Sequence, residues 1–386
     1  MSDEEDPVVV IDNGSGVCRA GFAGDDCPSV VLSSVVGYPK HKGVMLGMAQ
    51  NDSYVGKDAQ ERRGILDLNY PMDRGIITDW DDMEKIWHHV FFNELRRDPK
   101  ESHVLLSEPM LNPRNHREKL CEVMFETFQT PEFFVEIQPV LALHGKGTGT
   151  GTVVVSGEGL TQILPIFESC VISEAAMRLD LAGKDLTEHM MQLLTLRGYR
   201  FNTSADREAL RDMKETHCYV AADFDKEVLS SRTSAPSLEP VSSSFGERVY
   251  HLPDGQEVTI RDERFQCPEA LFRPWLLGKD CPGLHEAIYS SIMKSPIDTR
   301  RNLFAYIILS GGNTLFPGIA QRMMSEIRSL APEVKRTVRV TESKDRADFV
   351  WIGGSILGSL STFVGMSLTK AVYEDVGLSA LPRSPV

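Results

Sequence analysis

A short segment near the start of the sequence places glycines, a hydroxyl and a carboxylate directly after an apolar run that favours a β-strand. It follows residues 8–11 and reads Asp-Asn-Gly-Ser-Gly from residue 12 to residue 16. Glycine turns let backbone N–H groups approach phosphate oxygens without a Cβ in the way, and Ser15 could add a hydroxyl donor. A carboxylate at a strand end, such as Asp12, suits a Mg²⁺ ion held mainly through water. These residue types predict contact with a polyphosphate.

A second segment repeats this pattern later in the chain. It follows the apolar run 152–155 and reads Ser-Gly-Glu-Gly from residue 156 to residue 159. One supersecondary unit used twice suggests a duplicated, two-lobed protein, whose two turns would clamp a polyphosphate from both sides. A third glycine turn, Gly311-Gly312, follows residues 307–310 and could admit a flat base against the backbone. The residues alone do not identify that base.

The glycine-rich stretch 145–151 looks like a phosphate loop only in composition. The pattern G-x-x-x-x-G-K-[ST] is absent, and no helical pattern follows the glycines. We therefore interpret this stretch as a flexible connection between the two lobes.

Length, charge and cysteine usage narrow the class of protein. A chain of 386 residues exceeds what one hydrophobic core usually supports, which favours two lobes. The net charge of −14, from 41 Lys and Arg against 55 Asp and Glu, argues against direct nucleic-acid binding and favours basic protein partners. We expect no membrane insertion, because no apolar run reaches the roughly 20 residues of a span. We also expect no secretory signal, because residues 1–6 are acidic, whereas a signal would start basic and then turn apolar. Seven scattered cysteines without a C-x-x-C pair predict reduced thiols rather than disulfides or a zinc site.

Several stretches must form the elements that position these turns. Apolar residues recur at helical spacing in residues 79–96, and residues 114–128, 180–196 and 206–222 also read as helices. Residues 37–54 lack a helical period and predict a mobile loop. The serine-rich stretch 230–246 predicts a solvated loop, and residues 252–255 predict a hairpin turn.

The sequence resembles the actin family from about residue 7 to residue 375. The resemblance rests on long runs at residues 12–16, 20–26, 78–89, 124–128, 252–255, 309–312 and 350–357. It implies an α/β, actin-like ATPase fold, in which two duplicated RNase H-like lobes with four subdomains surround a nucleotide cleft. It further implies a first lobe of residues 1–145 plus 349–386, with a small mobile subdomain at 34–70. The second lobe would span 146–348, with a smaller subdomain at 182–279.

The resemblance also implies roles for individual residues around ATP or ADP and Mg²⁺ or Ca²⁺. Asp12 would face the water shell of the metal, Gln138 would position the attacking water, and Gln162 is a doubtful second catalytic residue. The remaining nucleotide contacts would come from the two phosphate loops, the nucleoside side and the base end: Gly14, Ser15, Gly16, Arg19, Gly157, Glu158, Gly159, Gly183, Arg211, Lys214, Glu215, Gly311, Gly312 and Asn313.

Four cleft positions depart from the residues that the family usually carries. Val155 replaces an Asp that orders the waters of the metal, and Glu158 replaces a shorter Asp. Gln162 replaces a His that orients the attacking water, and Ala347 aligns with a Lys beside the adenine. Losing one such group typically costs roughly 10²–10⁴ in rate, so hydrolysis should be slow while binding persists. The alternative is that Gln162 substitutes adequately and a water replaces the lost carboxylate.

Residues on the expected contact surfaces differ as well. Arg74 stands where the family typically has a modifiable His, and His144 and Ser367 replace a Tyr and a Trp near the cleft that receives partner helices. Lys279 brings a charge into an apolar contact segment, residues 273–280, and an unpaired ammonium there would be costly to bury. The loop at 230–248 is longer than usual, whereas the expected longitudinal contact loop, residues 41–48, matches well.

These observations support three readings of function. The leading one is a cytoskeletal structural subunit that holds a nucleotide, hydrolyses it slowly and joins filaments or a larger complex. The alternative is a conventional polymerising actin with intact ATPase activity, and the third is a small-molecule kinase of the same superfold. Expected partners are other actin or actin-like subunits and actin-binding or assembly-scaffold proteins. The expected location is the cytoplasm and cytoskeleton, with a ciliary or nuclear assembly also open.

Overall fold

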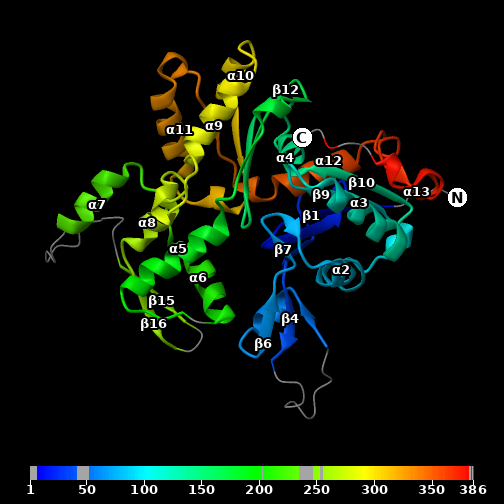
Figure 1. Ribbon diagram of the computed structural model, residues 1–386, viewed down its shortest axis with the longest axis horizontal. Coiled ribbons are helices and arrows are strands. Elements are labelled where there is room, and N and C mark those ends of the chain that lie inside the picture. The colour runs from blue at the N-terminus through cyan, green and yellow to red at the C-terminus, as the bar shows by residue number, and fades with distance from the viewer. Residues whose placement is uncertain are drawn as a thin grey trace.

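The computed structural model describes residues 7–40, 52–201, 203–233, 247–252, 255–381, 384 and 386. It is a flat α/β molecule with two groups of elements side by side, as Figure 1 shows. The predicted contact loop 41–48, most of the serine-rich loop and Pro253-Asp254 fall outside the described residues. No helix in the described residues has both the length and the apolar character to cross a membrane.

A six-stranded sheet forms the centre of the first group. Strands β1 (Val8–Asn13) and β2 (Val17–Phe22) form the hairpin that the Asn-Gly pair predicts, and β1 also runs parallel to β9 (His103–Glu108). The full order is β19 (Leu368–Thr369), β10 (Glu132–Ile137), β9, β1, β2 and β3 (Val30–Ser33). The apolar run 8–11 is therefore a central strand, and the glycine turn follows its carboxyl end.

A second sheet repeats this arrangement around β11 (Gly151–Ser156). That strand forms an antiparallel hairpin with β12 (Thr161–Phe167) and runs parallel to β17 (Ile307–Ser310). The order is β13 (Cys170–Val171), β12, β11, β17 and β18 (Val340–Thr341), with β14 (Met177–Leu179) also paired to β12. The predicted duplication is confirmed, because both sheets place a glycine turn between the strands of the same kind of hairpin.

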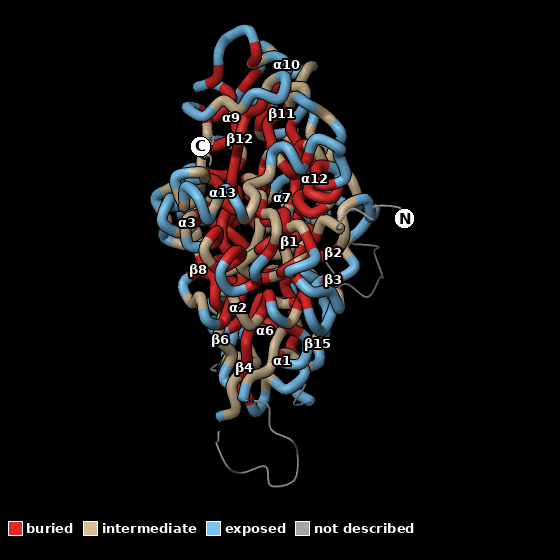
Figure 2. The backbone as a smooth tube through the Cα atoms, turned by 90° about the vertical axis from the view of Figure 1, so that its right-hand side faces the viewer, coloured by how far each residue is buried: buried red, intermediate tan, exposed pale blue. Residues whose placement is uncertain are grey.

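Two glycine-bearing helices join the sheets. These helices are α4 (Gln138–Gly145) and α12 (Phe349–Gly358), and they share a core with Val10 of β1 and Val153 of β11. The helices pack so closely that a Cβ on Gly145 would overlap the backbone of Phe349. Figure 2 shows buried backbone running through this central region. The close packing fixes the distance between the two glycine turns.

The outer elements cover the sheets with separate apolar cores. On the first sheet, α2 (Trp80–His88) continues as a π-helix to Leu95, α3 (Arg114–Glu122) continues as a π-helix to Thr127, and α13 (Lys370–Val376) follows near the end. The second half contains α5 (Gly183–Leu196), α6 (Ser204–His217), α7 (Phe224–Thr233), α8 (Glu263–Glu269), α9 (Leu284–Lys294), α10 (Arg300–Ala305), α11 (Ile319–Leu330), and the hairpin β15 (Arg248–His251) and β16 (Glu257–Ile260).

A small sheet extends from the first half. It consists of β5 (Tyr54–Val55), β4 (Val36–Pro39) and β6 (Leu66–Asn69), with α1 (Lys57–Glu61) packed beside it. The predicted loop 37–54 therefore begins and ends inside strands, because its flanking residues pair across this sheet. The hairpin β7 (Met72–Asp73) and β8 (Ile76–Ile77) leads back towards the first sheet.

Candidate functional site

A cavity of about 290 Å³ lies between the two hairpin turns. The turn after β1 and the turn after β11 form opposite walls, and residues around Gly311 close a third side. All the predicted nucleotide contacts except Gly183 line this cavity, together with both predicted catalytic glutamines: Asp12, Gly14, Ser15, Gly16, Arg19, Gln138, Gly157, Glu158, Gly159, Gln162, Arg211, Lys214, Glu215, Gly311, Gly312 and Asn313.

The two glycine turns approach each other too closely to tolerate side chains at their facing positions. A Cβ on Gly16 would lie 2.8 Å from Cβ of Glu158, and a Cβ on Gly159 would lie 3.0 Å from both Cβ of Ser15 and Cα of Arg74. Both distances are shorter than ordinary van der Waals contact. The glycines at these positions therefore allow the two halves of the molecule to meet at the cavity.

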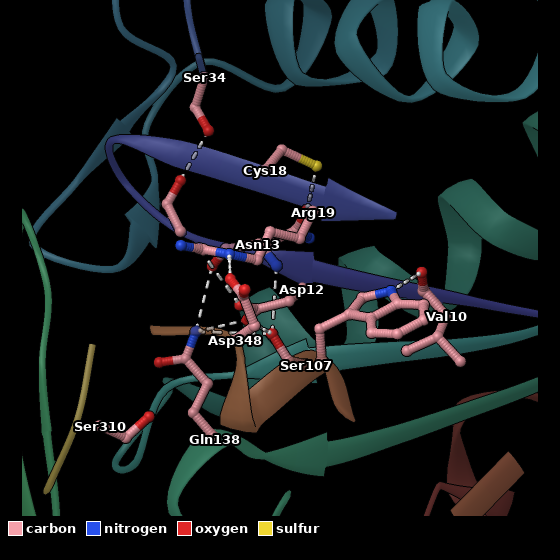
Figure 3. A network of polar contacts seen from close by, with 12 residues as sticks. Val10, Asp12, Asn13, Cys18, Arg19, Ser34, Ser107, Gln138, Ser310 and Asp348 are labelled. Atoms are coloured by element: carbon pink, nitrogen blue, oxygen red, sulfur yellow. Dashed lines mark hydrogen bonds and ion pairs between the residues drawn. The ribbon is translucent and has the colours of Figure 1, made fainter. Parts of the chain in front are cut away.

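Asp12 is the centre of a buried polar network, shown in Figure 3. Its Oδ1 accepts a hydrogen bond of 2.6 Å from Oγ of Ser107 and a longer one of 3.3 Å from Nε2 of Gln138. Gln138 also donates to the carbonyl oxygen of Asn13, at 3.2 Å. Burial raises the pKa of Asp12, whereas the charge of Arg19 and these hydrogen bonds act in the opposite direction.

The two predicted catalytic glutamines are hydrogen-bonded to each other. Nε2 of Gln162 donates to Oε1 of Gln138 at 2.7 Å, and the backbone N–H of Met110 donates to Oε1 of Gln162 at 2.5 Å. Both glutamines are almost fully buried. The side-chain amides are therefore held in fixed orientations, with the Gln138 carbonyl oxygen pointed at Gln162.

Arg19 lies on β2 and connects two carboxylates. Its Nε donates to Oδ1 of Asp348 at 2.6 Å, and its Nη1 lies 3.9 Å from Oδ2 of Asp12. Asp348 precedes α12, so this contact joins residues 329 positions apart in the sequence. Figure 3 draws Arg19 and Asp348 beside the Asp12 network.

Lys214 carries a buried ammonium beside the turn that follows β11. Its Nζ donates to the carbonyl oxygen of Gly183 and to Oγ1 of Thr187, both at 2.9 Å, and lies 3.5 Å from Oε2 of Glu158. Gly183 therefore lies behind the second turn, where its N–H also donates to the carbonyl oxygen of Gly157 at 3.0 Å. Gly183 supports the cavity wall in this structure and does not line it.

The remaining cation of the cavity, Arg211, is shared between two carboxylates of α6. It forms an ion pair with Glu208 at 2.8 Å and a longer one with Glu215 at 4.0 Å. Glu208 also accepts hydrogen bonds from Tyr70 and from Nε2 of Gln60, which belong to the first half of the molecule. This chain of contacts connects the cavity to the small sheet.

The third side of the cavity is largely apolar. Leu315, Phe316, Ala347 and Val350 line it beside the Gly311 turn. Gly311 has a φ of +87°, a conformation that L side chains rarely adopt, which explains the glycine at this turn. An apolar pocket next to glycine backbone has the chemistry to accept a flat heterocycle.

Sequence reasoning missed two polar residues of the network. Ser107 ends β9, the strand parallel to β1, and the carboxyl ends of neighbouring parallel strands lie at the same edge of a sheet. That rule gave a usable signal for Ser107. Asp348 carried no such signal, because only the packing of α12 brings it to Arg19.

The family model for actin matches residues 3–384, nearly the whole chain. The chain belongs to the actin family. Membership accounts for the duplicated sheets around one cavity and for the glycine turns at its walls. It does not account for Val155, Gln162 or Ala347, which line the cavity of this actin-family protein where the resemblance led us to expect Asp, His and Lys.

Proposed function

We propose that this actin-family protein holds ATP or ADP in its central cavity and acts as a structural subunit of a filament or larger assembly, with slow hydrolysis. Support for nucleotide binding comes from the glycine backbone. Beyond the adjacent residues, no atom lies within 4 Å of the Cβ position of Gly157 or Gly312, so a ligand can approach the Cα of both residues closely along the cavity wall. Such backbone suits phosphate and base contacts.

The hydrogen-bonded glutamines support slow hydrolysis. A water-positioning amide orients the attacking water by accepting a hydrogen bond from it through the carbonyl oxygen. In this protein Oε1 of Gln138 accepts from Gln162, whose own carbonyl oxygen accepts from Met110. Each oxygen keeps a second lone pair, but the bond between the two amides restricts the direction from which water can reach Oε1 of Gln138. This single observation carries the proposal of slow turnover.

Assembly is proposed from family membership, because actin-family proteins act as subunits and bind subunit-like partners. The kinase reading has less support. Each carboxylate that lines the cavity lies within 4.0 Å of a cation, so none is free to act as a base toward a substrate hydroxyl.

The decisive experiment measures nucleotide content and hydrolysis on the purified full chain. Nucleotide released by denaturation is identified by chromatography, and added ATP is expected to raise the melting temperature of nucleotide-free protein. At a ligand concentration one hundred times the Kd, the expected stabilisation is about 2.7 kcal/mol. Single-turnover phosphate release should then be slow, and pelleting with electron microscopy would report assembly.

The outcomes separate the parts of the proposal. An empty cavity with no melting shift on adding ATP would refute nucleotide binding. Phosphate release as fast as that of a conventional actin, compared at equal polymer content, would instead favour a polymerising ATPase. Monomers that neither pellet alone nor copolymerise with another actin would argue against the subunit role.

A further inference from the structure

Each carboxylate that lines the cavity has a cation within 4.0 Å. The lining contains three carboxylates and three cations, which form the pairs Asp12 with Arg19 at 3.9 Å, Glu158 with Lys214 at 3.5 Å, and Glu215 with Arg211 at 4.0 Å. Glu215 is the most exposed of these side chains and its pair is the weakest. No cavity carboxylate is therefore left without a positive partner.

A divalent cation, which proteins of this family generally bind with the nucleotide, finds few acceptors here. Mg²⁺ usually keeps several waters and is held by one or two carboxylates together with substrate phosphates. Oδ1 of Asp12 already accepts from Ser107 and Gln138, and Oδ2 faces the guanidinium of Arg19. The residues around the cavity thus fit a nucleotide better than they fit a firmly held metal ion.

Two further positions offer little to metal-bound water. Val155 presents only methyl groups to the cavity, and Oε1 of Gln138 already accepts one hydrogen bond, from Gln162. Within the described residues, no group of three or more His, Cys, Asp or Glu side chains is arranged to hold a metal. Val155 is also uncharged. A carboxylate at this position would repel the phosphates, and a metal would then be needed to offset that charge.

Arg19 is placed to contact a phosphate with donors that its two carboxylate partners leave unused. Its contacts with Asp348 and Asp12 engage Nε and Nη1, which leaves the Nη2 donors for a phosphate. A guanidinium binds phosphate through a planar pair of donors, and the short bond to Asp348 fixes the orientation of that plane. The cation is therefore oriented before a nucleotide arrives.

We infer that nucleotide binding in this cavity is largely independent of a divalent cation, with Arg19 as the cationic contact to the phosphates. This inference rests on the proposed nucleotide binding. Calorimetric titration of ATP and ADP into the nucleotide-free full chain, in Mg²⁺ and in EDTA, tests both. Because little of the binding free energy then depends on the metal, the two Kd values are expected to agree within about threefold.

Three variants sharpen the test. Arg19→Ala should weaken binding in EDTA by at least about tenfold, whereas Arg114→Ala, an exposed arginine of α3 paired with Glu118, should leave it unchanged. Val155→Asp adds a carboxylate that repels phosphates and can hold metal-bound water, so it should make binding Mg²⁺-dependent. Circular dichroism of each variant checks that the fold is retained.

The possible failures are distinguishable. Wild-type binding that weakens by about thirtyfold or more in EDTA would overturn metal independence while leaving the proposed nucleotide binding intact. Equal binding by Arg19→Ala and the wild type in EDTA would remove Arg19 from its assigned role. No binding in either buffer would refute the proposed function itself.

Discussion

The ammonium of Lys279 lies 2.8 Å from a carboxylate oxygen of Asp185. It also donates to the carbonyl oxygen of Asp180 at 2.6 Å, and Arg74 from the first half of the molecule reaches the same two acceptors at 3.1 Å and 3.0 Å. The charge that Lys279 brings into residues 273–280 is thus paired within this chain. Arg74 and Lys279 both differ from the residues that the family usually carries. They share the carboxylate of Asp185, and Arg74 reaches it from the other half of the molecule.

Removing that shared anion should destabilise the fold more than removing either cation. Asp185→Ala leaves two facing cations and also removes the acceptor for the N–H of Ala182 at the start of α5, so a loss of about 2–4 kcal/mol in unfolding free energy is expected. Lys279→Met should cost less than about 1 kcal/mol, because the ammonium is partly exposed and Asp185 keeps Arg74. Denaturant unfolding measures both. Equal losses in the two variants would contradict a shared anion.

Restoring the family residues at two of the four departing cleft positions should accelerate hydrolysis. Gln162→His replaces the amide that donates to Oε1 of Gln138 with an imidazole that can orient water as a base, and Val155→Asp adds an acceptor for ordered water. Each change is expected to raise single-turnover phosphate release by roughly 10-fold or more, given the usual 10²–10⁴ contribution of a positioned group. Gln162→Asn serves as the control that shortens the side chain without adding a base. Unchanged rates in the double variant would show that another step limits turnover.

Side chains added between the two glycine turns should open the cavity. Gly16→Ala brings a methyl group to within 2.8 Å of Cβ of Glu158, so the turns must separate and nucleotide affinity should fall by about tenfold. Gly64→Ala is a matched control, because no atom lies within 4 Å of its Cβ position. Binding titrations of both variants report the difference. Equal loss in both would indicate a general effect of substitution on the fold.

Buried His189 should make stability depend on pH with a defined sign. Burial lowers its pKa below the ordinary value of 6.5, with Gln192 acting in the opposite direction, so the folded protein keeps the ring neutral. Below about pH 6.5 the unfolded chain takes up a proton more readily than the folded protein does. The contribution of neutral His189 to the free energy of unfolding is therefore lost as the pH falls through the folded pKa. The contribution changes by at most about 1.4 kcal/mol per pH unit.

The measurement compares the wild type with His189→Asn, which cannot titrate in this range. Denaturant unfolding at pH 7.5 and pH 5.5 is the assay, and the wild type should lose stability relative to the variant at the lower pH. A constant difference between the two proteins across this range would exclude His189 as the titrating group.

The sequence by itself determined the local elements and the family. The apolar run and glycine turn at residues 8–16, and their echo at residues 152–159, predicted one strand-and-turn unit used twice, because strand patterns and turn glycines act over a few neighbouring residues. Helical spacing likewise predicted the segments that contain α2 and α3. The duplicated turns also indicated which residues would gather around a single cavity.

Only the tertiary structure decided which charged and polar side chains become partners. Arg19 pairs with Asp348, Gln138 with Gln162, and Lys279 with Asp185. In each pair the two residues come from different helices, strands or loops. Which side chains become partners depends on how α4 and α12 position the two sheets relative to each other. A difference of a few ångströms decides whether two side chains can reach one another. Spacing along the chain carries no such information, since several carboxylates and cations of the same type were equally available to each residue until packing brought one of them within hydrogen-bond distance.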